Sequence, residues 1–218
     1  MEKNLVSMSS NAVLIGLVGK SCAGKNEAGK ILEKYGWHVI DADAISRSVF
    51  SENVEEIHSL FIIEANKRGV KIENEDGSLN KKKLSSFLFK HKELLKKMED
   101  FVLPKIVKKI EKEIDYIIEN NAKPRIVLNA PTLHKTTLLE RCSYIIYIKS
   151  NFFIRLFRAI KRDGFSPINI CRRFLNQNDF FTQYISRKSD ILAIANDFGL
   201  KKLEKAIKTA LISVDLLK

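Results

Sequence analysis

Two glycines and a lysine near the start of the chain have the spacing of a phosphate-binding loop. The stretch VGKSCAGKNEAGK covers residues 18–30 and places Gly19, Gly24 and Lys25 in a G-x4-G-K pattern. Glycines let backbone N–H groups turn toward a bound anion, and the lysine reaches the terminal phosphates of a nucleoside triphosphate. An apolar run precedes the loop and a helical pattern follows it, as such a loop requires. We therefore expect nucleotide phosphates to bind here.

The residue after this lysine is unusual. A serine or threonine hydroxyl normally stands there and binds Mg²⁺, whereas this chain has Asn26. An amide oxygen is also a neutral oxygen ligand, so we expect Asn26 to contribute to a magnesium site, directly or through an extra water. The other loop residues expected to contact ATP are Cys22, Ala23 and Glu27.

Two acids follow one predicted helix later, in GWHVIDADAISR (residues 36–47). Asp41 and Asp43 are two residues apart on a predicted strand and should share one face of it. Asp43 is suited to accept or orient the proton of an acceptor hydroxyl, and Asp41 to hold magnesium through water. Asp43 could also cap the helix that is predicted to begin at Ala44, and the two roles are compatible.

The elements that must position these residues alternate between strands and helices. Short apolar runs predict five strands, at Ala12–Val18, Trp37–Asp43, Arg125–Pro131, Ser143–Ser150 and Ser189–Asp197. Apolar residues at helical spacing predict flanking helices at Asn26–Gly36, Asn151–Gly164 and Gly199–Val214. Such alternation is typical of an α/β protein with a parallel five-stranded sheet flanked by helices.

The segment between the second and third strands has a different character. From Ala44 to about Lys123 the pattern is mostly helical and rich in lysine. A polar turn at Glu73–Asn80 interrupts it, and Pro104 should kink or divide the helices. We therefore expect a helical insert in the sheet domain.

Composition limits the classes of partner. The 218 residues contain 38 Lys+Arg and 26 Asp+Glu, a difference of +12 that favours anionic partners. The basic residues are spread along the chain without a basic tail, so we expect no nucleic-acid binding. Three scattered cysteines without a CxxC pattern fit a reducing compartment, and no apolar run reaches the length of a membrane span. We expect a cytoplasmic protein that binds no membrane and is a monomer or a weak homo-oligomer.

Taken in order, these segments resemble those of dephospho-coenzyme A kinases. The matching stretches are LIGLVGKSCAGK, GWHVIDADAISR, DGSLNKKKL, HKELLKKMEDFVLPKI, VLNAPTL, RLFRAIKRD and SDILAIANDFG. They extend from about Leu14 to Leu211, which is nearly the whole chain. The ordered set is more specific than any single motif.

The resemblance implies a P-loop NTPase-type kinase that uses ATP and Mg²⁺ to phosphorylate the ribose 3′-hydroxyl of dephospho-CoA, the last step of coenzyme A synthesis. It implies a nucleotide-binding core at residues 11–50 and 124–218, a helical acceptor domain at 51–123 and a lid at 164–187. Within this scheme Arg47, Asp76 and Leu133, together with Asp43, would contact the acceptor.

The resemblance also implies roles on the ATP side. Asn196 and Gly199 would line the adenine. Arg158 and Arg162 lie four residues apart on one predicted helical face and would grip the γ-phosphate as charge develops, with Arg158 taking part in catalysis alongside Lys25. A solvated basic stripe would have the same spacing.

This sequence departs from the family pattern close to the chemistry. Asn26 replaces the hydroxyl ligand, Val18 stands where a threonine is usual, and Lys135 stands where a glutamate is usual. Two alternatives therefore stay open: a kinase of the same fold with another small acceptor, and a catalytically weak or inactive protein that only binds the nucleotide.

Overall fold

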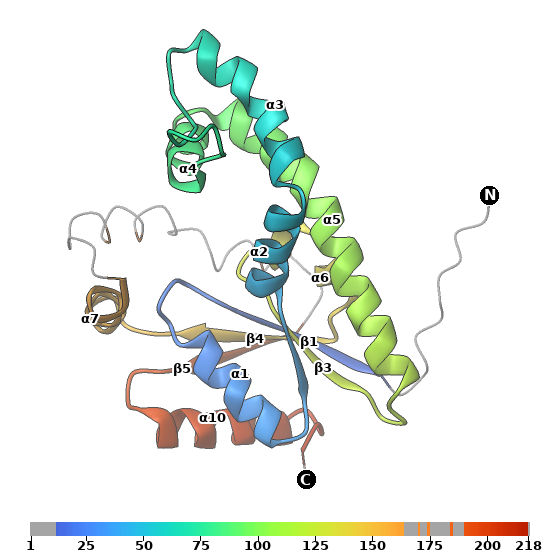
Figure 1. Cartoon of the computed structure of the whole chain (residues 1–218). Helices are drawn as coiled ribbons and strands as arrows, with labels where there is room; N and C mark the ends of the chain where they lie inside the picture. The colour runs from blue at the N-terminus through green and yellow to red at the C-terminus, as the bar shows by residue number, and fades with distance from the viewer. Residues whose placement is uncertain (1–11, 164–169, 171–173, 175–183, 185–189, 218) are drawn as a thin grey trace. The chain divides into compact units, whose positions relative to one another are not determined.

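The computed structural model describes residues 12–163, 170, 174, 184 and 190–217 (Figure 1). The chain forms two compact units. One is the continuous segment Ala42–Glu111, and the other combines the segments before and after it. Across the described residues, no helix has both the length and the apolar character needed to cross a membrane.

The larger unit is built on a five-stranded sheet. Its strands are β1 (Val13–Gly19), β2 (His38–Asp41), β3 (Arg125–Asn129), β4 (Tyr144–Lys149) and β5 (Asp190–Ala195). Their order is β2-β3-β1-β4-β5 and every neighbouring pair is parallel. The predicted parallel five-stranded sheet is confirmed. β1, β3 and β4 are almost wholly buried, which is why their sequences are continuous apolar runs.

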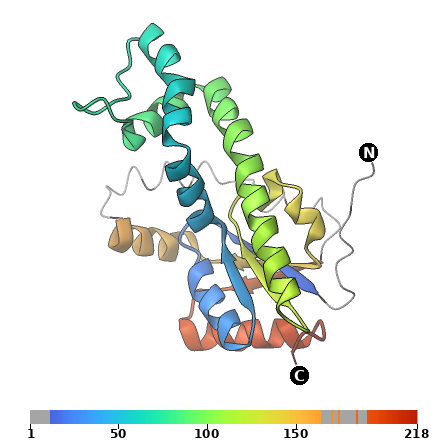
Figure 2. The same cartoon turned by 45° about the vertical axis from the view of Figure 1, so that its right-hand side comes forward.

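Two helices cover one face of this sheet. Figures 1 and 2 show α1 (Lys25–Lys34) and α10 (Leu200–Ile212) side by side beneath the strands. Alternate residues of β1 point into this layer and pack with apolar side chains of both helices. The buried members of this cluster include Ile15, Leu17, Ile31, Leu32, Leu203, Ile207 and Leu211.

The opposite face of β1 meets shorter elements, the 3₁₀ turn η1 (Leu133–Lys135) and helix α6 (Leu138–Arg141). Gly16 points to this side, where a Cβ atom would lie 2.6 Å from methyl groups of both Ile145 and Leu133. Only a glycine allows these side chains to approach the strand so closely.

The carboxyl ends of the strands meet at one edge. Asp41 of β2 pairs with Asn129 of β3, and Gly19 of β1 pairs with Ile148 of β4. Because β1 is the central strand, the loop that follows it opens at the point where the chain changes direction across the sheet. Ligands of open α/β sheets bind at this point. Helix α7 (Phe152–Asp163) follows β4 at the same edge.

The smaller unit is helical. It contains α2 (Ala42–Glu52), α3 (Val54–Lys67), α4 (Lys81–Lys90) and the first part of α5 (Lys92–Glu119). Its core contains fully or nearly fully buried side chains from α3 and α4, including Ile57, Phe61, Ala65, Phe87 and Leu88. Asn80 caps α4 by accepting hydrogen bonds from the backbone N–H groups of Lys82 and Lys83.

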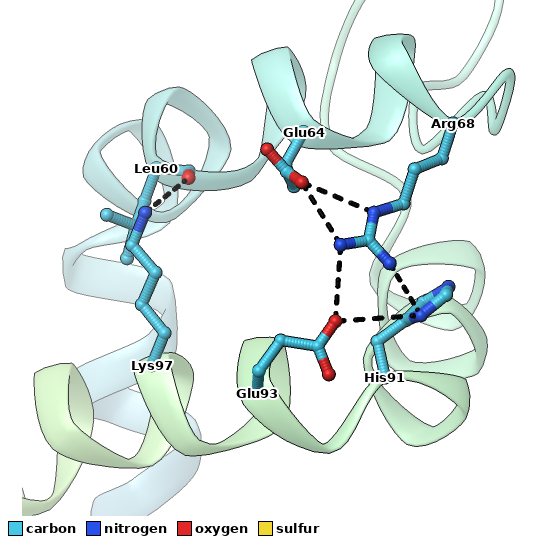
Figure 3. A network of polar contacts seen from close by, with 6 residues as sticks. All are labelled: Leu60, Glu64, Arg68, His91, Glu93 and Lys97. Carbon is cyan, nitrogen blue, oxygen red and sulfur yellow. Dashed lines mark hydrogen bonds and ion pairs between the residues drawn. The ribbon is translucent and has the colours of Figure 1, made fainter.

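A polar network ties α3 to the start of α5 (Figure 3). The guanidinium of Arg68 donates to Glu64 at 3.1 Å and to Glu93 at 3.2 Å, and to the Nδ1 atom of His91 at 2.8 Å. Lys97 donates to the backbone oxygen of Leu60 at 3.4 Å. Partly exposed ion pairs contribute little stability, so we infer that this network sets the helix register while the apolar core supplies the stability.

One sequence-based prediction was wrong. Helix α2 begins at Ala42, so Asp43 lies in its first turn and does not share a strand face with Asp41. A carboxylate is favoured in the first turn of a helix, because the helix dipole is positive there.

Pro104 does not divide α5. A proline in a helix interior costs about 3 kcal/mol. Burial of four isoleucine side chains of α5 outweighs this cost, because burying each one stabilises the folded state by about 1.5–3 kcal/mol. These are Ile106, Ile110, Ile114 and Ile117.

Alanine substitutions at two buried glycines, Gly16 of β1 and Gly29 of α1, should have opposite effects on stability. Gly16→Ala should lower the free energy of unfolding by about 1–3 kcal/mol, because its methyl group meets two methyl groups of a filled core. Gly29→Ala should raise it by about 1 kcal/mol, because Gly29 is inside α1 and a Cβ atom there lies 3.5 Å from Val39, an ordinary contact. Urea unfolding of both variants measures the difference. Equal effects would contradict the close packing at Gly16.

Candidate active site

The phosphate loop runs from the end of β1 at Gly19 to the start of α1 at Lys25. Two of its residues have left-handed backbone, Cys22 with φ 61° and Gly24 with φ 101°. Such residues curl the chain so that N–H groups converge on a bound anion. Gly24 is also sterically required, because a Cβ atom there would lie 2.1 Å from the Nδ2 atom of Asn196.

The carbonyl side of the loop is held by three side chains from distant segments. Arg155 donates from Nε to the oxygen of Ser21 at 2.8 Å. The oxygen of Ala23 accepts from Asn196 at 2.9 Å and from Arg158 at 3.3 Å. In a trans peptide the N–H points opposite to the carbonyl, so the next N–H groups, those of Cys22 and Gly24, point away from these side chains.

A cavity of about 250 Å³ opens beside the loop. All of its lining residues were predicted from the sequence to belong to the ATP site. They are Cys22, Gly24, Lys25, Asn26, Glu27, Arg158 and Arg162. Three of these side chains are cationic, and the helix N-terminus of α1 adds a partial positive charge. The cavity is suited to a polyphosphate.

The three cationic side chains, Lys25, Arg158 and Arg162, have different positions in this cavity. The Nζ atom of Lys25 donates to the oxygen of Gly19 at 3.0 Å, so the ammonium lies over the loop. Arg158 also donates to the oxygen of Asn196 at 2.9 Å, which fixes its guanidinium between the loop and β5. Arg162, four residues later on α7, has an exposed side chain at the cavity's edge. The structure therefore gives Arg158 a part in holding the loop.

The segment after β5 supports the loop from the other side. Asn196 is 4% exposed and its side chain faces the loop. Gly199 has φ 89° and marks the start of α10. Their expected contacts with adenine stay a prediction.

Two asparagines meet where a magnesium ion is expected. The Nδ2 atom of Asn129 donates to the Oδ1 atom of Asn26 at 3.3 Å. Asn129 is 6% exposed, and its own Oδ1 atom has no hydrogen-bond partner among the described residues. Asp41, at the end of the neighbouring strand, pairs with Asn129. An unpaired buried oxygen beside an amide and a carboxylate suits a hydrated hard cation.

Three of the predicted acceptor residues, Asp43, Arg47 and Asp76, belong to the smaller unit. Asp43 and Arg47 are exposed and four residues apart on α2, hence on one face of it. Asp76 lies in the turn before α4 and accepts two hydrogen bonds from Ser78, which lower the pKa of its carboxyl. Leu133 is 1% exposed and packs in the sheet core, so only its backbone could meet a ligand. The predicted lid, 164–187, falls outside the described residues apart from Ile170, Phe174 and Tyr184.

Sequence reasoning missed three residues of this site: Asn129, Arg155 and Asp197. Asn129 is the first polar residue after the apolar run of β3, which is a usable signal. Arg155 precedes Arg158 by three residues and Arg162 by seven, so it lies on the same helical face. Asp197 follows Asn196, and its carboxylate accepts from Ser150 and from the backbone of Asn151, both at 2.8 Å.

Comparison with known proteins agrees with this geometry. A protein-family model described as dephospho-CoA kinase matches residues 13–199. The dephospho-CoA kinase of Treponema denticola is 45% identical over 198 residues, covering 91% of this chain and 88% of its own. That of Treponema pallidum is 38% identical over 184 residues, covering 84% and 86%.

A solved structure shares the fold. The protein TT1252 from Thermus thermophilus superimposes with a TM-score of 0.75 at 22% identity, covering 94% of this chain and 99% of its own.

Asp197 gives a pH-dependent prediction. Hydrogen bonds from Asn151 and Ser150, with the charge of Arg158, hold the pKa of its carboxyl below the usual value. A depressed carboxyl pKa stabilises the folded state above about pH 4, and this contribution disappears as the pH falls through the folded-state pKa. Asp197→Asn should therefore lower the free energy of unfolding by about 0.5 kcal/mol at pH 7, since solvent screens the partly exposed carboxylate, and by less near pH 3.

Urea unfolding at both pH values measures this effect, and Glu33→Gln on exposed α1 surface is the control. An equal loss of unfolding free energy at both pH values would show that the charge of Asp197 does not stabilise the contact with Ser150 and Asn151.

Proposed function

The chain belongs to the dephospho-CoA kinase family, and we propose that it transfers the γ-phosphoryl group of ATP to the ribose 3′-hydroxyl of dephospho-CoA. This is the closing reaction of coenzyme A synthesis. The observation that carries the proposal is the anchored loop, whose N–H groups, Lys25 and Arg162 surround one polyphosphate-sized cavity. Phosphoryl transfer asks a protein mainly for positioning and for neutralisation of charge, and this cavity is built for both.

On the donor side, Lys25 exchanges the oxygen of Gly19 for β- and γ-phosphate oxygens when ATP binds. Its ammonium is a mobile point charge, so the exchange needs no change in the loop. Arg162 is exposed at the edge of the loop cavity, a position that suits contact with the developing charge on the γ-phosphate. Arg158 keeps the loop in place and lines the cavity beside it.

On the acceptor side, Asp43 is the proposed proton acceptor of the 3′-hydroxyl, and Arg47 lies on the same face of α2 to contact the acceptor. Asp76 and Leu133 remain proposed acceptor contacts, and the helical segment 51–123 the proposed acceptor domain. We also propose that residues 164–187 close over ATP to exclude water. The cytoplasmic location and the monomeric or weakly associated state stay predictions.

The residues at the sheet edge fit a magnesium ion. Among the described residues no three His, Cys, Asp or Glu side chains form a cluster. Magnesium does not need one, because it keeps several waters and takes few protein ligands. Asn26 would hold the ion, with Asn129 and Asp41 accepting hydrogen bonds from its waters. When bound, the ion neutralises phosphate charge.

Transfer of label from [γ-³²P]ATP to dephospho-CoA tests the proposed function. Lys25→Ala should abolish measurable transfer, a loss of more than about 100-fold, because the cation that contacts the β- and γ-phosphates is removed from the developing charge. Lys34→Ala is the matched control, since this lysine is exposed in the last turn of α1 and does not line the loop cavity.

The wild-type result separates the alternatives. Transfer to another small acceptor, but not to dephospho-CoA, would mean a kinase of different specificity. Thermal stabilisation by ATP without any transfer would mean a protein that only binds the nucleotide.

Asn26 gives a prediction about the metal. Asn26→Ser should lower the magnesium concentration needed for half the maximal rate, because a hydroxyl is the smaller ligand and Mg²⁺ demands near-ideal octahedral geometry. Initial rates in a magnesium titration, at saturating ATP and acceptor, measure the shift. An unchanged half-maximal concentration would show that the ion is held by Asp41 and water instead.

A further inference from the structure

The smaller unit contains a cavity of about 320 Å³ that is lined by four lysines. They come from the segment between α3 and α4 and from α4 itself, and they are Lys71, Lys82, Lys83 and Lys90. None of the residues proposed to contact ATP or the acceptor is among the described residues that line this cavity. The proposed phosphoryl transfer therefore does not explain it.

The protein does not neutralise the positive charge at this cavity. Across the part of the chain that the structure describes, Lys71, Lys82 and Lys90 take part in no ion pair. Lys83 donates to the backbone oxygen of Glu73 at 2.7 Å, a neutral partner that holds the ammonium in place. No acidic side chain is among the described lining residues. The cavity therefore has a positive potential that favours an anion.

Three lining residues of α4 lie in one row. Lys82, Ser86 and Lys90 follow one another at intervals of four residues and so share a face of the helix. Ser86 is about 6 Å along the helix axis from each lysine, a distance that an extended lysine side chain spans. The arrangement is locally unfavourable, because the first turn of α4 contains lysines and no acid. Departures of this kind from local preference are expected where a chain serves a function.

His91, which follows α4, adds a neutral donor to the same wall (Figure 3). A guanidinium can only donate, so the Nδ1 atom of His91 accepts from Arg68 at 2.8 Å and the ring proton is on Nε2. Arg68 is itself held by Glu64 and Glu93. The imidazole also packs edge-on against Phe87, with 5.1 Å between the ring centroids. These contacts fix the orientation of the ring that lines the cavity.

We propose that this cavity binds a small phosphate monoester with an apolar body, distinct from both ATP and dephospho-CoA. A phosphate monoester carries almost two negative charges and three terminal oxygens, whereas a carboxylate has one charge and two oxygens. The phosphate therefore matches several lysines, a hydroxyl and an N–H group better. Phe87, 2% exposed, and the half-buried Val70 provide apolar contacts for the rest of the ligand.

The size of the cavity favours a small ligand. At about 320 Å³ it is at the lower end of ligand sites, which span roughly 300–1,000 Å³. A phosphate with one ring or a short carbon chain fits this space better than a complete nucleotide does. This proposal does not depend on the proposed kinase activity.

NMR of the histidine side chains observes this cavity separately from the loop cavity. The chain has four histidines, and a ¹H–¹³C spectrum reports the Cε1–H group of each. Phenyl phosphate, added at constant pH and ionic strength, should shift the His91 signal to saturation. It should leave the signal of His38 unchanged, because His38 belongs to the larger unit. His91→Gln identifies the signal.

Two further probes separate the phosphate from the apolar body. Inorganic phosphate should require about a fivefold higher concentration for half-saturation, because it lacks the ring that contacts Phe87 and Val70. Phenol, which lacks the charge, should produce no saturating shift.

Substitution of the lysines tests the charges. Lys82→Gln and Lys90→Gln, both on exposed side chains, should each raise the half-saturating concentration of phenyl phosphate about fivefold. Lys108→Gln is the matched control, an exposed lysine of the same unit that does not line the cavity. Lys25→Ala should leave the His91 shift unchanged, because Lys25 lines the loop cavity instead. Thermal unfolding of each variant checks that it is folded.

Three outcomes would overturn the proposal. The first is a shift that does not saturate, or that saturates at the wild-type concentration in both lysine variants. The second is an equal shift with polyglutamate, which would show unspecific attraction of anions. The third is displacement of phenyl phosphate from the His91 site by ATP or dephospho-CoA, which would assign the cavity to a substrate. Transfer of label to dephospho-CoA by the wild type tests the proposed function separately from all three.

Discussion

The nucleotide site depends on the hydrogen bonds that the backbone carbonyl groups of the phosphate loop accept. A loop can present N–H groups to an anion only if its carbonyls have partners elsewhere, since unpaired peptide groups are costly to bury. Here Arg155 takes the oxygen of Ser21, and Asn196 and Arg158 take that of Ala23. These hydrogen bonds hold the loop in the conformation that has left-handed backbone at Cys22 and Gly24.

The sheet positions these donors, because each one lies directly after a strand or on the helix that follows it. Arg155 and Arg158 start from α7, which follows β4, and Asn196 follows β5. Asp197 joins the two strand ends by accepting from Ser150 and Asn151. The loop is therefore held by segments more than 130 residues away in sequence, as the separations of 134, 135 and 173 residues show. It forms only when the strands on the β4 side of β1 are in register.

This explains what the sequence could and could not predict. The strands and their flanking helices follow from local patterns, since apolar runs and glycine turns act within a few residues. The loop cavity was predictable because Gly24, Lys25 and Asn26 are adjacent. The start of α2 at Ala42 was missed because the sequence Asp41-Ala42-Asp43 continues the alternating pattern of the strand, although its last two residues form the first helical turn. The partnership of Asn129 with Asn26 spans 103 residues and leaves no periodic signal.

The distribution of charge across the site has a mechanistic consequence. At the proposed magnesium site Asn26 and Asn129 are neutral amides, and Asp41 is the acid among the residues proposed to hold the hydrated ion. Positive charge is concentrated in the loop cavity, which Lys25, Arg158 and Arg162 line. Of these, Arg158 is held by the oxygens of Ala23 and Asn196, and a charge that is held in place needs no reorganisation as the transition state forms. The protein's own cations therefore supply much of the charge neutralisation that the proposed phosphoryl transfer needs.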